Sequence, residues 1–132
     1  MRNMMAAAAI GAAGLFLCSV AIGASGAVAS ETAAPRARPA GFAACAACHT
    51  TETGRNGFGP SLAGVAGRRA ASLPTYAYSD ALKNSGLVWN AATLDRWLTS
   101  PQRAVPGTKM PFAGIPDPAK RKEVVDYLLT LK

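Results

Sequence analysis

The chain has 132 residues, a length that accommodates one domain. It carries 14 Lys and Arg residues against 7 Asp and Glu, a formal net charge of +7, and half of its residues are hydrophobic. No segment combines a stripe of basic residues with interleaved aromatics, which argues against a nucleic-acid-binding protein.

Residues 1–29 have the pattern of a secretory signal peptide. Arg2 is their only charged residue, an apolar run extends over 4–23, and Ala27-Val28-Ala29 has the small-x-small pattern that a signal peptidase reads. We expect cleavage after Ala29. An uncleaved membrane anchor is the alternative, since about 20 residues can span a bilayer, but this run is rich in weakly hydrophobic Ala and Gly.

The processed chain would keep a net charge of +6, because the formal charge of +7 loses only Arg2. It would contain two Cys, one His and one Met: Cys45, Cys48, His49 and Met110. Residues 30–39 are polar and contain Pro, which predicts a flexible leader before a folded domain over 40–132.

The first part of this domain predicts short helices separated by long loops. Pro39 is expected in the first turn of a short helix that leads into the segment 45–49. Residues 50–74 are rich in Gly and Pro, and no strand-like alternation is found. A second short helix is expected over 79–84, closed by Gly86.

The second part carries clearer helix signals. Asn90 is the expected cap of a helix over 91–99, and its apolar residues follow helical spacing; they are Leu94, Trp97 and Leu98. Pro101 should end it and begin an irregular segment over 101–116.

Asp117 and Pro118 should begin the last helix. Its apolar face comprises Val124, Tyr127, Leu128 and Leu131. Its basic residues 120–122 are expected at the surface. The fold class is therefore all-α, with three to five short helices and long loops.

The pentad Cys45-Ala46-Ala47-Cys48-His49 is the attachment signature of a c-type haem. One helical turn separates the two thiols so that they reach two vinyl groups at one edge of the ring, and the next residue presents an imidazole to the iron. Three other interpretations fit less well. A thioredoxin-like dithiol expects a βαβ context, a zinc site needs four ligands, and a disulfide here would close too short a loop.

Met110 is the predicted sixth ligand of the iron. Low-spin electron-transfer haems pair His with Met or a second His, and the processed chain has no second His. Met110 follows the irregular, proline-braced stretch that begins at Pro106. Lys109 could ligate at high pH but is normally protonated. An iron held by two side chains has no open position, which favours electron transfer over catalysis.

Further motifs follow the pentad in order, and Phe42 precedes it. They are Gly59-Pro60-x-Leu62-x-Gly64, Gly67-Arg68, Tyr76-x-Tyr78-Ser79-x-Ala81, Gly86-x-x-Trp89, Leu94-x-x-Trp97-Leu98-x-x-Pro101 and Pro106-Gly107-Thr108-Lys109-Met110. This series, over residues 42–129, resembles class I c-type cytochromes, in particular the mitochondrial-type group with its soluble bacterial relatives.

The resemblance implies a small cytochrome c fold wrapped around one haem c, and it implies further roles. The Pro60 carbonyl would accept the second ring N–H of His49. A haem propionate would lie near Arg68, Tyr78, Trp89 and Thr108. The crevice would be walled by Leu62, Leu98 and Phe112. Phe42 would pack against the last helix.

Three positions depart from the family pattern. Arg38 stands where the family usually has a Gly at the crossing of the first and last helices, which predicts a changed crossing. Trp97 and Leu82 replace the usual Tyr and Asn beside the Met ligand, which predicts a less polar pocket.

The expected function is that of a periplasmic mono-haem one-electron carrier, not an enzyme. Redox protein partners would dock at a basic rim around the haem edge, comprising Lys83, Arg103 and Lys109. We expect a monomer, with membrane contact only if residues 1–29 stay attached. A dedicated electron-accepting subunit of one dehydrogenase and a haem peroxidase are the alternatives.

Overall fold

The computed structural model describes residues 36–132. The expected signal peptide over 1–29 and its cleavage after Ala29 therefore lie outside the described residues, as does most of the leader. At the start of the described part, Arg36 pairs with Asp126 of the last helix, with 2.9 Å between Nη1 and Oδ2.

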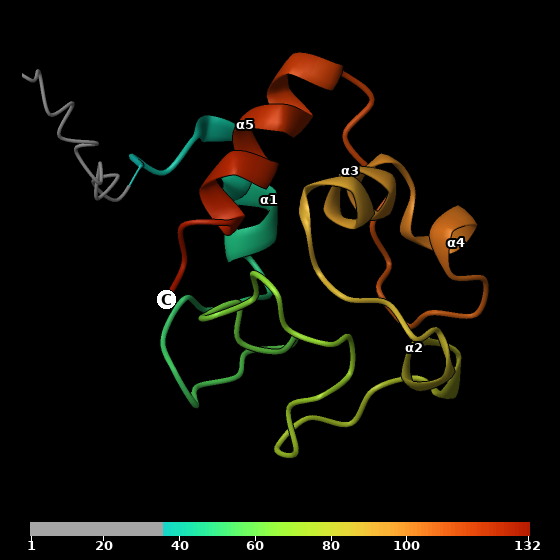
Figure 1. The fold of residues 1–132 in the computed structure, drawn as a ribbon. Coiled ribbons are helices and arrows are strands. Elements are labelled where there is room, and N and C mark those ends of the chain that lie inside the picture. The colour runs from blue at the N-terminus through green and yellow to red at the C-terminus, as the bar shows by residue number, and fades with distance from the viewer. Residues whose placement is uncertain (1–35) are drawn as a thin grey trace, which may run out of the picture. The chain divides into compact units, whose positions relative to one another are not determined.

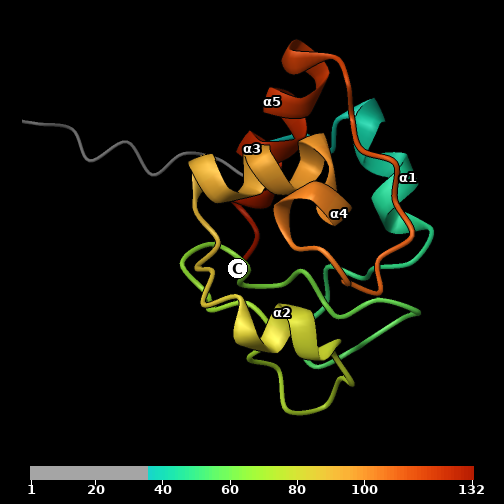
Figure 2. The ribbon, with the colours of Figure 1, turned by 90° about the vertical axis from the view of Figure 1, so that its right-hand side faces the viewer.

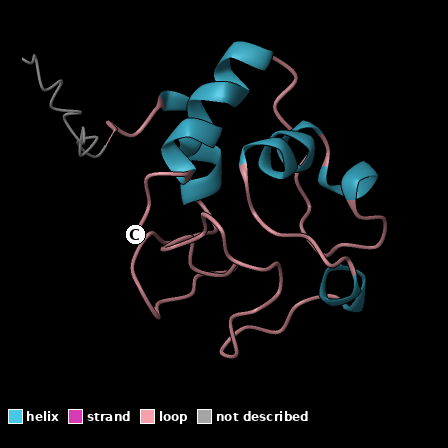
Figure 3. Cartoon of the chain, in the orientation of Figure 1, coloured by secondary structure: helices cyan, strands magenta, loops and turns pink. Residues whose placement is uncertain are grey.

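Within residues 36–132 the elements are helices only, as the all-α prediction requires, and one isolated bridge joins Arg69 and Val88 (Figure 3). A 3₁₀ turn over Ala40–Phe42 runs directly into α1. The α-helices are α1 (Ala43–Ala46), α2 (Asp80–Asn84), α3 (Ala91–Thr99), α4 (Pro101–Ala104) and α5 (Pro118–Leu128). No helix in this part of the chain is long and apolar enough to cross a bilayer.

The expected caps are present, because short polar side chains satisfy the first N–H groups of three helices. The Asn90 side chain accepts from the backbone N–H of Thr93, and the Thr93 side chain accepts from the backbone N–H of Asn90. The two bonds form a capping box for α3. Asp117 accepts from two backbone N–H groups of α5. Ser79 caps α2 in the same way. Pro39 is the residue before the first 3₁₀ turn, one position earlier than expected.

The prediction of an irregular segment over 101–116 is wrong at its start. Pro101 ends α3 but begins α4, because the first position of a helix has no use for a backbone N–H. Ser100, with an extended backbone at φ −167°, separates the two helices. The N–H of Val105 then bonds to the Pro101 carbonyl at 2.9 Å and closes the turn.

The two ends of the domain pack against each other through the 3₁₀ turn and α5 (Figure 1). Phe42 is fully buried and meets Tyr127 edge to face, with 4.8 Å between ring centroids. A Cβ on Gly41 would lie 3.1 Å from Val124 Cγ2. Gly41 thus allows a close crossing although Arg38 stands at the position where a Gly was expected, and the expected packing of Phe42 on the last helix is found.

One basic residue of α5 is structural, contrary to the expected surface role of residues 120–122. The Arg121 side chain is only 12% exposed and donates to Asp95 of α3 at 2.7 Å. It also donates to the carbonyl of Ile115 at 2.8 Å. Arg121 therefore ties α3, α5 and the loop between them together.

The helices and the longest loop occupy different sides of the domain (Figures 1 and 2). Helices α1, α3 and α5 lie together, and α4 lies beside α3. The loop over 47–79 forms the other side and leads to α2. The buried residues of α3, which are Leu94, Trp97 and Leu98, face the interior between these two sides.

Candidate functional site

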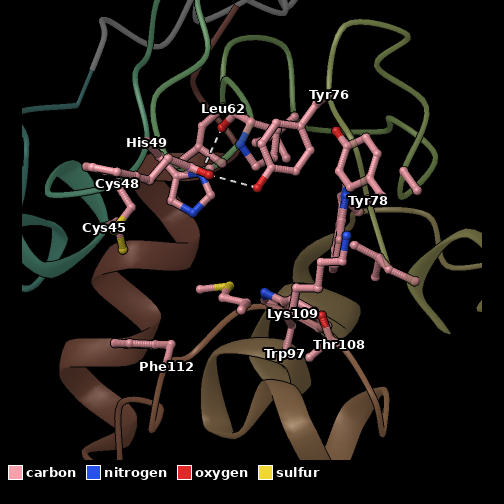
Figure 4. Close-up of a pocket in the computed structure, with 18 of the residues that line it drawn as sticks. Cys45, Cys48, His49, Leu62, Tyr76, Tyr78, Trp97, Thr108, Lys109 and Phe112 are labelled. Atoms are coloured by element: carbon pink, nitrogen blue, oxygen red, sulfur yellow. Dashed lines mark hydrogen bonds between the residues drawn. The ribbon is translucent and has the colours of Figure 1, made fainter. Parts of the chain in front are cut away.

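A cavity of about 460 Å³ lies inside the domain. This volume is within the range of small-molecule and cofactor sites. Its walls come from several separate segments between residues 44 and 128 and are mostly apolar, with Leu62, Leu98 and Phe112 among them as expected. Figure 4 shows Cys45, Cys48 and His49 on one side and Lys109, Thr108 and Phe112 across from them.

The imidazole of His49 is held in one orientation. Its Nδ1 lies 2.7 Å from the carbonyl oxygen of Pro60. A carbonyl can only accept, so Nδ1 carries the proton and Nε2 keeps its lone pair. Burial lowers the pKa of His49 below its usual range, and the bond to Pro60 opposes this shift in part. The ring is therefore neutral near pH 7 and offers Nε2 as a metal ligand.

A tight loop brings the backbone close to this ring. The N–H of Gly59 bonds to the carbonyl of Cys48 at 2.9 Å. A Cβ on Gly59 would lie 2.6 Å from His49 Nδ1 and 2.8 Å from Nε2. A Cβ on Gly57 would collide with the Cys48 carbonyl. Only glycine fits these two positions, because a real Cβ does not approach other atoms so closely.

We predict that Gly59→Ala destabilises the folded protein by about 3 kcal/mol, near the upper end of what overpacking costs. The added methyl group must push the His49 ring away from the Pro60 carbonyl. Denaturant unfolding measures the effect. Gly54→Ala is the control, because Gly54 has φ +74° but nothing within 4 Å of its Cβ position, and it should cost only about 1–2 kcal/mol. Equal losses for both variants would show that contact with His49 is not the cause.

The two cysteines lie at one edge of the cavity. Cys45 is buried and Cys48 exposed, and neither is in a disulfide. Both the N–H of Cys48 and that of His49 bond to the Cys45 carbonyl, at 3.1 and 2.9 Å. Burial raises the pKa of the Cys45 thiol. One turn of backbone therefore presents two thiols and an imidazole to the same cavity.

The loop after α4 lies across the cavity from His49 (Figure 4). Thr108, Lys109, Met110, Pro111 and Phe112 all line it. Thr108 is buried, and no hydrogen bond of its hydroxyl to another side chain or backbone group is found within residues 36–132. Leu82 and Trp97, the two positions with unusual side chains, also line the cavity, so its wall is apolar there.

Polar groups meet the cavity at Arg68, Tyr78 and Trp89. The guanidinium of Arg68 donates to the carbonyls of Ala63 at 2.6 Å and Ser61 at 2.8 Å. Burial lowers the pKa of Arg68 and raises the pKa of Tyr78, and each group opposes the shift of the other. An arginine stays charged under such a shift. Two of its five N–H groups are used, so a cation with further donors borders the cavity.

All nine residues singled out from the sequence line this one cavity. They are Cys45, Cys48, His49, Pro60, Arg68, Tyr78, Trp89, Thr108 and Met110. Two further residues received no role from the sequence although they belong to its motifs. Gly59 contacts the His49 ring, and the hydroxyl of Tyr76 donates to the Phe58 carbonyl at 2.8 Å. Gln102, whose side-chain amide donates to the Thr108 carbonyl, belongs to none of the sequence motifs.

The donor set agrees with a covalently attached haem. Such a haem needs two thiols at one edge of an apolar cavity and a neutral imidazole nitrogen that faces the metal. The thiols of Cys45 and Cys48 and the Nε2 of His49 meet these needs, and Met110 supplies a thioether to the same cavity. The lining has a half-buried cation, Arg68, which suits the carboxylates of a haem.

Comparison with known proteins places the chain in a family. The model of the Cytochrome c family matches residues 39–132. Cytochrome c2 iso-2 of Magnetospirillum molischianum is 50% identical over 94 residues, which cover 71% of this chain and 97% of the relative. Cytochrome c2 of Rhodoblastus acidophilus is 52% identical over 92 residues, or 69% and 86% of the two chains.

Among solved structures, cytochrome cH from Methylobacterium extorquens is similar, with 52% identity and a TM-score of 0.63. The match covers 67% of this chain and 89% of that one. Members of this family transfer electrons and are not enzymes. The predicted fold and cofactor are thereby confirmed, and the chain belongs to the cytochrome c family as a class I c-type cytochrome, an electron carrier with one covalently bound haem c.

Proposed function

We propose that this cytochrome carries single electrons between redox enzymes of an electron-transport chain in the periplasm. Residues 1–29 would direct export and be removed after Ala29, residues 30–39 would form a leader, and 40–132 the carrier domain. The observation that carries the proposal is the juxtaposition of His49 Nε2 and Met110 at one apolar cavity. Both axial positions of an iron would then be taken by side chains.

Each residue of the donor set has one task. Cys45 and Cys48 form the thioether bonds that keep the cofactor from leaving. His49 binds iron through Nε2, while its proton on Nδ1 stays with the Pro60 carbonyl. Met110 would bind the iron through its sulfur. When bound, the haem supplies a one-electron iron couple, and a Met ligand raises its reduction potential relative to bis-His ligation.

The polar residues of the cavity serve the carboxylate side of the cofactor. Arg68 keeps three N–H groups beyond those given to backbone carbonyls. Tyr78, Trp89 and Thr108 add O–H and N–H donors from the same cavity wall. We assign these four residues to a propionate, because a buried carboxylate is tolerated only when it is hydrogen-bonded or paired with a cation.

Optical and redox titration of the purified protein tests the core of this proposal. A low-spin haem spectrum with a near-infrared sulfur-to-iron band in the oxidised protein is expected, together with a single one-electron potential. Mass spectrometry of the same sample should give one haem and an N-terminus at Ser30. A spectrum of high-spin iron without that band would contradict an electron carrier with His and Met ligands.

A basic rim near the cavity would attract acidic redox partners to a monomeric carrier. Lys109 lines the cavity, and Arg103 lies exposed on the neighbouring α4. Lys83 of α2 is the weakest member, because it pairs with Asp80 at 3.1 Å in an exposed i, i+3 contact. Such a pair holds little energy and leaves Lys83 able to meet a partner.

We predict that ferricyanide oxidises the reduced protein faster at low than at high ionic strength. Between ~0.01 M and ~1 M salt the Debye length falls from ~30 Å to ~3 Å, and the rate should fall on the order of tenfold. The cation tris(phenanthroline)cobalt(III) should show the opposite trend. Stopped-flow absorbance measures both rates.

Charge reversal locates the rim. Arg103→Glu and Lys109→Glu should each slow ferricyanide and weaken its salt dependence. Lys120→Glu changes the net charge equally on α5, where Lys120 does not line the cavity, and should have little effect. If all three variants behaved alike, net charge rather than a rim would govern the approach of partners.

A further inference from the structure

The side-chain amide of Gln102 reaches from α4 to the loop that carries Met110. Its Nε2 donates to the carbonyl of Thr108 at 2.8 Å. A longer and weaker contact of 3.5 Å joins the same nitrogen to the carbonyl of Met110. One amide group thus spans the loop on both sides of Lys109.

Gln102 extends from a firmly anchored helix. Pro101, beside it in the chain, is among the most completely buried residues, and Val105 is 7% exposed. These two residues hold α4 against the interior from both ends. The N–H of Thr108 bonds to the carbonyl of Val105 at 3.2 Å, so the entry of the loop is tied to α4. Gln102 adds a second tie further along.

The loop has few other ties near Met110. Within residues 36–132 the backbone N–H groups of Lys109 and Met110 have no hydrogen-bond partner. The one other bond of this stretch joins the N–H of Phe112 to the carbonyl of Met110 at 3.0 Å, and it lies within the loop itself. Gln102 therefore makes the side-chain link from residues 108–110 to the rest of the described domain, while Arg121 holds the same loop further along, at Ile115.

We propose that Gln102 is a positioning residue that holds the loop of Met110 over the cavity and sets how readily Met110 is displaced from the iron by an external ligand. The inference rests on the proposed role of Met110 as an axial ligand. Displacement requires the loop to move outward, and the two contacts of Gln102 would be broken in that movement. In the open state the amide would form hydrogen bonds with water instead. The closed loop is therefore favoured by the net free energy of one hydrogen bond within the protein relative to one with water.

This value fixes the size of the expected effect. A typical hydrogen bond contributes a net amount that corresponds to between about twofold and about tenfold in an equilibrium constant. Loss of the Gln102 donor should therefore tighten the binding of an external ligand to the oxidised protein by between about twofold and about tenfold. Fold and haem content should be unchanged, because Gln102 is exposed.

Imidazole titration of the oxidised holoprotein tests the proposal. Fading of the near-infrared sulfur-to-iron band measures the displacement of Met110. Gln102→Leu and Gln102→Glu both lack the donor, and both should bind imidazole more tightly. Gln102→Lys keeps an N–H donor at similar reach and should behave like the unmodified protein. If affinity instead followed side-chain charge, with Glu and Lys on opposite sides of Leu, the proposal would be overturned.

Thr130→Val is the matched control for loss of a bond. The Thr130 hydroxyl donates to the carbonyl of Tyr127 at 2.7 Å, after the end of α5 and outside the cavity lining. Removing it lowers stability without touching the Met110 loop, so imidazole affinity should not change. If Thr130→Val bound imidazole as tightly as the Gln102 variants, imidazole affinity would follow the general stability of the protein. That result would overturn the role of Gln102.

The two proposals fail in different ways. An unmodified protein without the sulfur-to-iron band would refute Met110 as a ligand and, with it, the role of Gln102. A clear band with equal imidazole affinity in the unmodified, Leu and Glu proteins would refute only the role of Gln102.

Discussion

A double variant with Cys45→Ala and Cys48→Ala is expected to be colourless, largely unfolded and rapidly degraded. The cavity of about 460 Å³ is walled by apolar side chains from most of the domain. Without the cofactor these apolar side chains would lose their packing partners or meet water, which lowers stability. A typical domain is stable by only about 5–15 kcal/mol. Haem that binds only the folded state removes this loss of stability.

Expression of the variant beside the unmodified protein makes the measurement. Haem-stained gels, mass spectrometry and circular dichroism should show no attached haem and no cooperative thermal transition. Ala47→Ser changes a residue between the two cysteines that does not line the cavity, and it should keep both colour and fold. A colourless double variant that melted cooperatively would mean that the polypeptide packs without its cofactor.

Met110→Leu should abolish the sulfur-to-iron band and lower the reduction potential while the protein stays folded. Leu has nearly the volume of Met, and such exchanges usually cost less than about 1.5 kcal/mol. The iron would lose the ligand that favours its reduced state, and axial ligands set haem potentials over a range of ~0.8 V. The downward shift should therefore be far larger than that of any substitution on the surface. Potentiometric titration measures it.

The neighbouring residue supplies the control for this variant. Lys109 also lines the cavity and is the alternative ligand at high pH. Lys109→Arg keeps the charge but removes the amine that could bind iron, so the band and the potential near pH 7 should stay as they are. A potential that fell in Lys109→Arg but stayed unchanged in Met110→Leu would exchange the roles of the two residues.

Helices α3 and α5 were predictable from the sequence because their signals are local. Asn90 and Asp117 cap the helices at the positions expected from their chemistry, and the apolar spacing after each marks the buried face. The cavity residues were equally predictable, because the haem attachment motif and the order of the later motifs identify them. These features need only neighbours in the chain, or a resemblance, to be recognised.

What the sequence did not reveal depends on contacts between distant segments. Arg121 was expected at the surface, but its side chain is largely buried and pairs with Asp95 of α3. Gly41 took over the helix crossing because Val124 lies directly against it. No periodicity or composition encodes such pairings.

The contact between Phe42 and Tyr127 joins residues from opposite ends of the domain. Joining residues of such long sequence separation costs loop-closure entropy. Nearly the whole domain must therefore be present, on the proposed periplasmic side of the membrane, before this contact can form. Until then the core that buries the neighbouring Cys45 is incomplete, so the sulfur atoms of both cysteines are within reach of a haem.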